Sequence, residues 1–355
     1  MTRPAVLITG CSGLIGTALS RRLASGYELV GLDMKEPPED TQLDSVIYLD
    51  VTSDLSVHDA MRRVRDDHGD HFAAVVHLAA YYDFTGEPSP LYEEITVRGT
   101  ERLLTALQEV EVERFVFSST MLVHAPVKPG EHIDEESPLD PHWAYPVSKA
   151  DTERVIGAKR GRIPVVLLRI AGVYTDVGTQ PTLVQQIKRI HQRDLTSFFF
   201  PGDSDAGQSL VHLDDAVDAI ARSVERRDTL PEEVAILVGE PDPPSYASLQ
   251  DEIGERIWGD EWPTIRVPEP MAKAGAWVQE KVSDGFIRPY MIELADDHYA
   301  LDVSRAQELL GWTPRRRLMG TLPGMIRKLR EDPAAWYRAN DLEVPEHMEA
   351  EPARS

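Results

Sequence analysis

The sequence predicts an α/β protein, with a doubly wound parallel sheet followed by a smaller C-terminal α/β domain. Throughout the first half, short apolar runs alternate with longer segments of helical periodicity. The runs are almost continuously apolar, which is typical of strands buried on both faces. Glycines follow the first run directly, where such a sheet turns into its first helix. Regular alternation of this kind predicts parallel strands with helices on both sides.

The individual elements follow from this alternation. In the first half the predicted strands are 5–10, 27–33, 45–51, 72–80, 114–120 and 164–174, and the predicted helices are 13–26, 56–67, 91–110 and 146–161. The second half is richer in proline and less regular. Its predicted elements are the helices 181–193 and 245–257, a strand at 233–239, and a strand end that runs into a helix at 210–226.

Composition and charge exclude several classes of partner. The 355-residue chain has a net charge of −23, and such a surface repels nucleic acid and anionic membranes. No apolar run is long enough to span a bilayer, and the first residues lack a signal-peptide pattern, which predicts a cytoplasmic protein. The single cysteine, Cys11, excludes an intrachain disulfide. His68 and His71 lie in a polar stretch without a third ligand nearby, so no metal site is predicted.

The segment TGCSGLIG lies between the first strand and the first helix, where a dinucleotide fingerprint is expected. Gly10 allows a tight turn, Gly13 lets backbone N–H groups approach a pyrophosphate, and Gly16 lets the helix pack close to the sheet. Asp33 ends the second strand, where a carboxylate accepts hydrogen bonds from ribose hydroxyls and repels a 2′-phosphate. The segment therefore predicts a Rossmann-type sheet that binds NAD. Lys35, two residues further on, keeps NADP as the less favoured alternative.

A tyrosine and a lysine, Tyr145 and Lys149, are four residues apart at the start of a predicted helix. They lie one turn apart on the same face. Free tyrosine has a pKa of ~10 and is a poor base at neutral pH. A nearby ammonium, together with an oxidised nicotinamide, lowers that pKa. Tyr145 is then able to take a proton from a substrate hydroxyl as hydride leaves its carbon. Pro146 is compatible with the first helical turn, where its missing N–H would have no partner.

In order and spacing these motifs resemble the extended short-chain dehydrogenases/reductases, in the NAD-dependent epimerase/dehydratase family. The similarity extends from residue 5 to residue 325. The matching segments are TGCSGLIG (9–16), Asp33, LDV (49–51), HLAA (77–80), VRGT (97–100), FSST (117–120), YPVSK (145–149), LRIAGVY (168–174), GDSDAGQSLVHLDDA (202–216) and LDVSRAQELLGWTP (301–314).

The resemblance implies an NAD-dependent enzyme that moves hydride at a secondary alcohol or ketone. It assigns Thr120, Tyr145 and Lys149 to catalysis, with Thr120 orienting the substrate oxygen and Lys149 also binding the nicotinamide ribose. The cofactor-binding residues that it implies are Gly10, Ser12, Gly13, Leu14, Ile15, Gly16, Asp33, Asp50, Val51, Leu78, Ala79, Ala80, Ser118, Tyr145, Lys149 and Val173.

The same resemblance divides the chain and predicts its assembly. Residues 1–174, with returning segments near 208–240, are expected to form the NAD-binding Rossmann domain. Residues 175–330 are expected to form the substrate-binding domain, and 331–355 a C-terminal extension and tail. Relatives dimerise through two long helices, so a homodimer is expected. The apolar area of its interface is expected to come from Leu103, Leu104, Leu107, Val155 and Ile156.

Three positions depart from the family pattern. Thr96 stands where an asparagine is usual. Met121 and Leu122 replace the Asp–Glu pair of sugar-nucleotide dehydratases, which disfavours the elimination of water. Gln208 replaces an arginine that meets the substrate diphosphate, which weakens the case for a diphosphate substrate. The candidate replacement cations are Arg222, Arg266 and Arg288.

Three functions remain open at this point, and we favour the first. It is an epimerase of a nucleotide sugar, which regenerates its NAD in each cycle. The second is an NAD(P)-dependent dehydrogenase or reductase of a steroid-like or other apolar substrate. Residues 271–302 resemble such reductases, and Trp277, Phe286 and Met291 either face the substrate or close the core of the smaller domain. The third is an NAD-binding sensor without turnover, which would have no need of an intact set of catalytic side chains.

Overall fold

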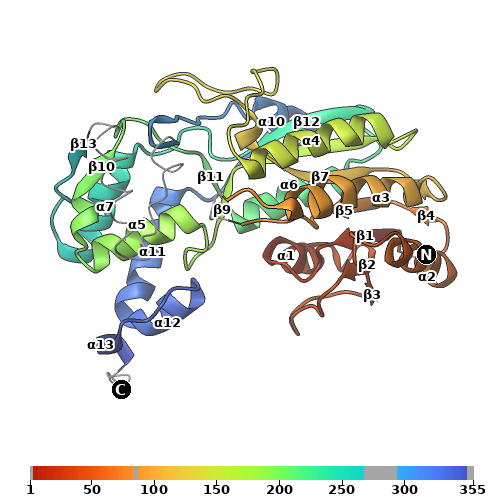
Figure 1. Cartoon of the computed structure of the whole chain (residues 1–355), viewed down its shortest axis with the longest axis horizontal. Coiled ribbons are helices and arrows are strands. Elements are labelled where there is room, and N and C mark those ends of the chain that lie inside the picture. The colour runs from red at the N-terminus through yellow and green to blue at the C-terminus, as the bar shows by residue number, and fades with distance from the viewer. Residues whose placement is uncertain (1–2, 84–86, 268–293, 350–355) are drawn as a thin grey trace.

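The computed structural model describes residues 3–83, 87–267 and 294–349. In this part of the chain a seven-stranded, fully parallel sheet lies at the centre of the larger half, in the order β12–β8–β7–β5–β1–β2–β3 (Figure 1). Its strands are β1 (Ala5–Thr9), β2 (Glu28–Asp33), β3 (Ser45–Tyr48), β5 (Ala74–His77), β7 (Phe115–Thr120), β8 (Val165–Ile170) and β12 (Glu233–Val238). This is the doubly wound sheet that the sequence predicts.

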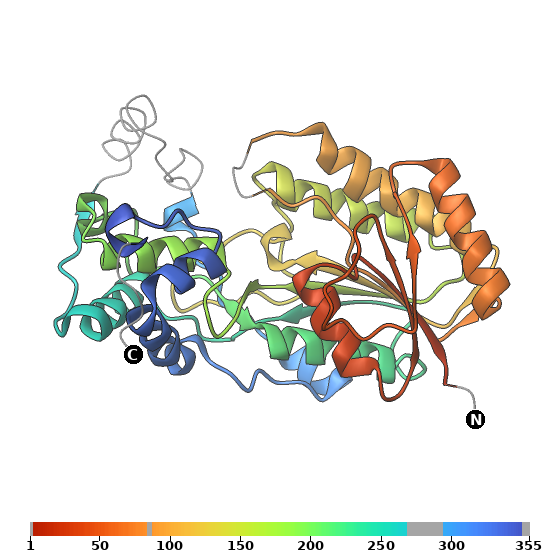
Figure 2. The ribbon, with the colours of Figure 1, turned by 90° about the horizontal axis from the view of Figure 1, so that it is seen from below.

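Helices cover both faces of the sheet (Figure 2). One layer consists of α2 (Asp54–His68), α3 (Arg98–Leu107) and α4 (Ala144–Lys159), and the other of α1 (Leu14–Leu23), α6 (Leu213–Glu225) and α10 (Ser304–Leu310). Each layer closes a separate hydrophobic core against the sheet. Every residue of β1 and β8 is buried, which explains their continuously apolar sequences.

Three predicted elements are divided in the structure, and the first is the predicted strand 72–80, of which Phe72 belongs to β4 (His71–Phe72) and residues 74–77 form β5. The predicted helix 91–110 begins with a π-helical turn, η1 (Tyr92–Val97), before α3. The predicted strand 164–174 ends as β8 and resumes as β9 (Gly172–Tyr174), which leaves the main sheet and pairs with β11 (Leu210–His212). The larger half also contains the short elements β6 (Glu111–Val112), which pairs with β4, and η2 (Met121–Val123).

The smaller half packs around a third hydrophobic core at one end of the sheet (Figure 1). Its elements are α5 (Pro181–His191), η3 (Leu195–Phe198), β10 (Phe199–Pro201), α7 (Tyr246–Trp258), β13 (Ile265–Val267), η4 (Leu294–Asp296), α11 (Leu318–Glu331), α12 (Pro333–Ala339) and α13 (Glu346–Glu349). Ser245 caps α7 by accepting a hydrogen bond from the N–H of Ser248. None of the helices in the described ranges is long and apolar enough to cross a membrane. Trp277, Phe286, Arg288, Met291 and the last six residues of the tail lie outside these ranges.

The leucines that were expected at a dimer interface belong to the protein's own core. Leu103, Leu104 and Leu107 are fully buried, and Ile156 is 1% exposed. They pack between their helices and the sheet, while Val155 is partly buried. The prediction is therefore wrong for Leu103, Leu104, Leu107 and Ile156, because the amphipathic pattern directs these side chains towards the sheet, and it stays untested for Val155. The homodimer itself stays a prediction.

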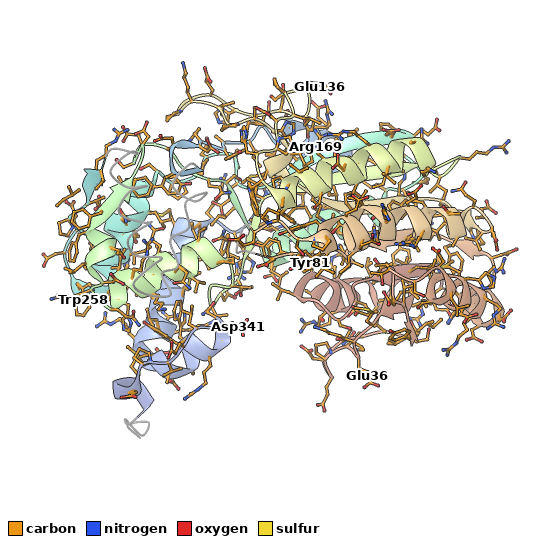
Figure 3. All side chains as sticks on the ribbon, viewed as in Figure 1. Glu36, Tyr81, Glu136, Arg169, Trp258 and Asp341 are labelled. Carbon is orange, nitrogen blue, oxygen red and sulfur yellow. The ribbon has the colours of Figure 1, made fainter. Side chains whose placement is uncertain are left out.

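A buried ion pair joins strand β8 of the sheet to helix α4. Arg169 on β8 and Glu153 on α4 lie 2.8 Å apart, with side chains 8% and 7% exposed (Arg169 is labelled in Figure 3). Ser119 on β7 donates a hydrogen bond of 2.5 Å to the same carboxylate. Arg169 also donates to the backbone oxygen of Glu135 and lies 3.0 Å from His124 Nε2. The network therefore ties β7 and β8 to α4.

We expect Glu153→Gln to lower the free energy of unfolding by ~3–5 kcal/mol, because it leaves the Arg169 charge buried without a counter-ion. Urea denaturation measures this change. Arg154→Ala is the matched control, since Arg154 is 73% exposed and pairs with Asp151 at the surface. Its loss should change the stability by less than ~1 kcal/mol. Equal effects of the two replacements would contradict a structural role of the buried pair.

Candidate active site

The carboxyl ends of the central strands lie side by side at one edge of the sheet. Thr9 at the end of β1 is in register with His77 at the end of β5, and Thr120 at the end of β7 with Ile170 at the end of β8. Doubly wound sheets bind ligands at this edge, where the strand order reverses. A cavity of about 720 Å³ opens there, and both halves of the molecule line it.

The three glycines of the first loop have different physical roles. Gly10 has a φ of +70°, and a Cβ added there would lie 2.8 Å from Ala79 N. A Cβ on Gly16 would lie 2.4 Å from the carbonyl oxygen of Gly10. These two positions require glycine for the fold itself. A Cβ on Gly13 would meet its nearest atom at 3.4 Å, an ordinary contact, so the protein has no packing need for glycine at this point on the cavity wall.

The start of α1 suits an anionic group. The helix begins at Leu14 without a side-chain cap and without an acidic residue in its first turn. Its first N–H groups therefore have no intrahelical partners, and the positive end of the helix dipole lies at the cavity. Because Gly13 has no side chain that would block access to these N–H groups, this arrangement fits the pyrophosphate of a dinucleotide. The residues present thus match the group that the sequence predicts.

The side chain of Asp33 forms hydrogen bonds with the backbone of the glycine loop and of the residues after β2. Its carboxylate accepts hydrogen bonds of 3.0 Å from the N–H groups of Ser12 and Lys35. Burial and the charge of Asp33 raise the pKa of Cys11 to about 11. Cys11 therefore stays a neutral thiol, and its role is packing, since its sulfur would lie 2.8 Å from a Cβ on Gly31.

A chain of buried polar groups fixes the strand end that follows β5. The N–H groups of Leu78 and Ala79 both donate to Thr9 Oγ1 at 3.2 Å. That hydroxyl lies 2.7 Å from His77 Nδ1, and His77 Nε2 lies 2.9 Å from Thr100 Oγ1. Burial lowers the pKa of His77 to about 3, so the ring is neutral. Because Thr9 already accepts twice, its proton is directed to Nδ1, and Nε2–H donates to Thr100.

Tyr145 and Lys149 meet the end of β7. Lys149 Nζ donates a hydrogen bond of 2.7 Å to the carbonyl oxygen of Ser118. It lies 4.8 Å from the ring centre of Phe117 and 5.9 Å from that of Tyr145. Thr120 is near enough to Tyr145 to lower the pKa of its phenol, and both side chains line the cavity. The structure therefore brings the three predicted catalytic side chains together on one side of the cavity.

The pKa shifts in this cluster are dominated by burial. Burial raises the pKa of Tyr145, as does the neighbouring Tyr82, while Thr120 lowers it. Burial lowers the pKa of Lys149 to about 7, and the charge of Glu153 acts in the opposite direction. The sequence-based expectation for Tyr145 counted both Lys149 and an oxidised nicotinamide. The side chains on their own give the opposite direction, because removing the phenol from water is the largest effect.

Aromatic residues that the sequence did not single out surround the phenol. The ring of Tyr82 lies edge-on to that of Tyr145 at a centroid distance of 5.0 Å. Trp143 precedes Tyr145 by two residues, and the centroids of their rings are 5.5 Å apart. Both line the cavity. Both residues stand close to family motifs in the sequence. Their sequence spacing, however, does not indicate that they pack on the same ring.

The predicted residues divide into three groups by position. The residues that line the cavity are Gly10, Gly13, Leu14, Ile15, Gly16, Leu78, Ser118, Thr120, Tyr145 and Val173. Lys149 is 3% exposed and is not among the residues that line the cavity. The remaining predicted positions are near the glycine loop or the neighbouring strand ends, namely Ser12, Asp33, Asp50, Val51, Ala79 and Ala80. Thr96, in place of the usual asparagine, accepts a hydrogen bond from the N–H of Tyr81.

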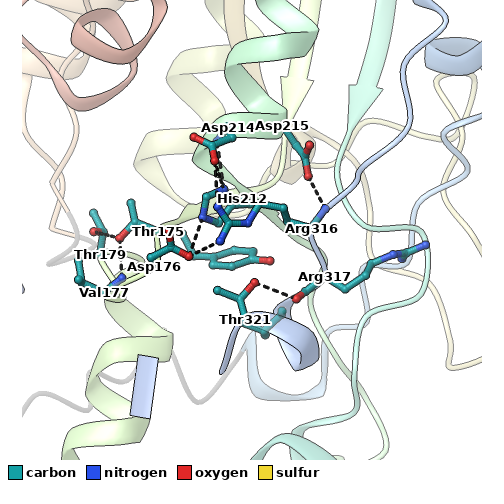
Figure 4. Close-up of polar contacts among 12 residues, drawn as sticks. Thr175, Asp176, Val177, Thr179, His212, Asp214, Asp215, Arg316, Arg317 and Thr321 are labelled. Carbon is teal, nitrogen blue, oxygen red and sulfur yellow. Dashed lines mark hydrogen bonds and ion pairs between the residues drawn. The ribbon is translucent and has the colours of Figure 1, made fainter. Parts of the chain in front are cut away.

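Charged contacts link the segment after β9, the start of α6 and the segment before α11, which lie next to the cavity wall of the smaller half. Arg316 contacts both Asp176, just after β9, and Asp214, at the start of α6 (Figure 4). The carboxylate of Asp215 accepts hydrogen bonds from the backbone N–H groups of Arg315 and Arg316. These contacts fix the path of the chain on either side of the cavity, which Thr179, Gln180 and Leu318 then line.

Two of the candidate replacement cations lie elsewhere. Arg222 donates to Asp218 at 2.7 Å and to backbone oxygens at the end of α10. Arg266 is exposed and pairs with Asp203 at 3.2 Å. Among the described residues that line the cavity, the basic side chain is that of Arg189 on α5, which sequence reasoning missed. Within residues 3–83, 87–267 and 294–349, no three His, Cys, Asp or Glu side chains are grouped as metal ligands.

Several curated proteins are similar to this chain. An N-acetyl-alpha-D-glucosaminyl-diphospho-ditrans,octacis-undecaprenol 4-epimerase of Escherichia coli O157:H7 is 30% identical over 151 residues, 42% of each chain. UDP-glucose 4-epimerase of Vibrio cholerae is 23% identical, and the alignment covers 88% of this chain and 92% of that one. Sterol-4-alpha-carboxylate 3-dehydrogenase of Candida albicans is 22% identical, with 87% and 93% covered.

Solved structures and a family profile lead to the same group. The structure of MoeE5 in complex with UDP-glucose and NAD matches with a TM-score of 0.67 and 25% identity, over 92% of this chain and 98% of that one. The profile of the NAD dependent epimerase/dehydratase family matches residues 6–239. Because that match covers well over half of its length, this chain belongs to the NAD-dependent epimerase/dehydratase family, the group of extended short-chain dehydrogenases/reductases that its sequence resembles.

Proposed function

We propose that this protein is an NAD-dependent epimerase of a nucleotide sugar. The observation that carries the proposal is that one cavity joins the glycine loop, the Tyr145–Thr120 pair and the polar and aromatic wall of the smaller half. The full-length relative from Vibrio cholerae is a UDP-glucose 4-epimerase, and MoeE5 was crystallised with UDP-glucose and NAD. Both support a sugar nucleotide as the substrate class.

In this proposal each side chain has a defined task. NAD, when bound, supplies the carbon that accepts a hydride and returns it. Gly13, the start of α1 and Asp33 would hold the dinucleotide. Tyr145 removes the proton of the reacting hydroxyl and later returns one, and Thr120 hydrogen-bonds the same oxygen. The ammonium of Lys149 stabilises the phenolate electrostatically. The packing of aromatic rings around the phenol excludes water, which strengthens these interactions.

A second function has specific support. Much of the cavity wall is apolar, with contributions from Leu183, Phe199, Phe200, Leu210 and Leu249. The relative from Candida albicans is a sterol dehydrogenase. A dehydrogenase of an apolar hydroxy or keto compound would use the same Tyr145 and Lys149, but would release its reduced cofactor in every cycle. The two functions therefore differ in the fate of NAD.

Further properties accompany the proposal. Asp33 at the end of β2 supports a preference for NAD over NADP. The division into a cofactor domain and a substrate domain is supported by the third hydrophobic core, which extends from Tyr174 to Tyr337 and so includes α12. A homodimer and a cytoplasmic location remain part of the proposal.

With catalytic amounts of NAD, we expect the protein to convert a UDP-sugar into an epimer without net formation of NADH. Nuclear magnetic resonance of the sugar and absorbance at the NADH band measure the two quantities together. Tyr145→Phe should lower turnover by ~10²–10⁴-fold, because it removes the acid–base group. It should leave NAD binding unchanged. Tyr82→Phe is the matched control, since it keeps the ring that packs on Tyr145 and should retain most activity.

One NADH formed for each substrate consumed would instead establish the dehydrogenase. Equal turnover in Tyr145→Phe and in the unmodified protein would refute the assigned role of the phenol under either function.

We expect alanine at two of the glycines to have separable effects. Gly16→Ala should destabilise the fold by ~1–3 kcal/mol or more, because its Cβ has no room beside a backbone oxygen. Gly13→Ala should leave the melting temperature unchanged, since the residue has a φ of −79° and no close neighbour. It should weaken NAD binding by at least ~10-fold, which corresponds to ~1.4 kcal/mol. Thermal melts and NAD titrations test both; unchanged NAD affinity in Gly13→Ala would contradict the assigned pyrophosphate site.

Replacement of Asp33 should change the cofactor preference. Asp33→Ser removes the repulsion of a 2′-phosphate, so the ratio of the NADPH and NADH dissociation constants should fall by ~10-fold or more. Lys35→Ser provides the comparison and should shift the same ratio in the opposite direction or leave it unchanged. Fluorescence titration with both cofactors gives the ratios. An unaltered ratio in Asp33→Ser would show that the selectivity has another origin.

A further inference from the structure

Arg189 is a cation on the wall of the cavity that has no hydrogen-bond or ion-pair partner among the described residues. It lies on α5, three residues after Gln186, which lines the same cavity. Its Nε is closed off from solvent and has no hydrogen-bond partner. In the part of the chain that the structure describes, its guanidinium forms no ion pair and no hydrogen bond. A guanidinium has five N–H donors, and burying one of them, as at this Nε, without an acceptor is unfavourable.

The acidic residues nearby do not compensate this charge. Asp194 acts electrostatically on Arg189, against the effect of burial, which lowers the pKa of the arginine. The carboxylate of Asp194, however, caps η3 by accepting hydrogen bonds of 2.8 and 2.9 Å from Thr196. Asp297 is the acidic residue among the described residues of the cavity wall, and it lies near Tyr246 and Tyr299, whose pKa values it raises.

Two other arginines of the described chain are occupied by carboxylates. Arg316 is held by Asp176 and Asp214, and Arg222 by Asp218. Gln208, which stands where relatives have an arginine, lines the cavity as a neutral group. Among the described residues of the wall, an available positive charge is thus found on α5, at a position that no family motif marks.

We infer that Arg189 binds the diphosphate of the nucleotide-sugar substrate and supplies the cation that Gln208 lacks. This inference rests on the proposed function and names the residue that recognises the substrate anion. A guanidinium matches two phosphate oxygens with parallel N–H donors, and such bonds are strong where water is excluded. The neutral amides of Gln186 and Gln208 are further donors on the same wall, and the aromatic and apolar residues provide the low-dielectric surroundings.

The test compares ligands with and without a diphosphate on protein saturated with NADH, so that the dinucleotide site is filled. Calorimetric titration with UDP and with uridine gives the two affinities. Arg189→Gln should weaken UDP binding by on the order of 10–100-fold and leave uridine binding unchanged. Lys188→Gln is the matched control, because it removes the same charge one residue away, at a position that does not line the cavity. It should bind both ligands as the unmodified protein does.

A second measurement separates recognition from a structural role. Without ligand, Arg189→Gln should melt at the same temperature as the unmodified protein or higher, because it removes an unpaired, half-buried charge. UDP should raise the melting temperature of the unmodified protein and of Lys188→Gln, but not that of Arg189→Gln. A lower melting temperature of the free variant, with an unchanged ratio of UDP to uridine affinity, would overturn the inference.

Inorganic pyrophosphate distinguishes this inference from the proposed function. Suppose that pyrophosphate binding depends on Arg189 but UDP binds no more tightly than pyrophosphate. Arg189 then binds anions as inferred, and a nucleotide-containing substrate is refuted. If UDP binds equally well to Arg189→Gln and to the unmodified protein, the anion site is refuted and the nucleotide-sugar function stands. Failure of the unmodified protein to bind either probe overturns the inference.

Discussion

The buried pair of Arg169 and Glu153 is the interaction on which the geometry of the site depends. It connects β8 to α4, and Ser119 extends the connection to β7, one residue before Thr120. The helix that it fixes carries Tyr145 and Lys149 in its first two turns. Glu153 follows Lys149 by one turn, and its charge opposes the lowering of the lysine pKa by burial. One carboxylate therefore positions the helix that carries Tyr145 and Lys149 and favours the charged form of the lysine.

Buried polar groups in this protein fall into two kinds with different consequences. The hydroxyls and imidazole of Thr9, His77 and Thr100 satisfy one another, so they stay neutral and only position the backbone that follows β5. Lys149 is a buried cation and Arg189 a half-buried one; burial lowers the pKa of each, and the charges of Glu153 and Asp194 compensate this only in part. Unpaired charge is unfavourable for folding, and it is retained here at the two places where a ligand anion or phenolate would meet it.

Sequence patterns within a short segment predicted the features that depend on interactions within that segment. The apolar runs predicted the strands, and the spacing of Tyr145 and Lys149 predicted a shared helix face. The roles of Gly10 and Gly16 agree with the close backbone contacts that the structure shows. Contacts between distant segments were not predictable in this way. The partnership of Glu153 with Arg169 and the isolation of Arg189 depend on how α4, β8 and α5 pack. An amphipathic pattern also does not say which surface its leucines meet, which is why the interface assigned to Leu103 was wrong.

The net charge of −23 does not conflict with an anionic substrate. Surface charges are screened over ~8 Å at physiological ionic strength, so they affect the approach of a ligand more than its bound state. Inside the cavity the interaction between Arg189 and an oxyanion takes place in low-dielectric surroundings, where the same charges attract several times more strongly than in water. A single desolvated guanidinium can therefore outweigh a diffuse acidic surface. The acidic surface governs the rate of encounter and its dependence on salt, whereas the cavity wall governs which ligand stays bound.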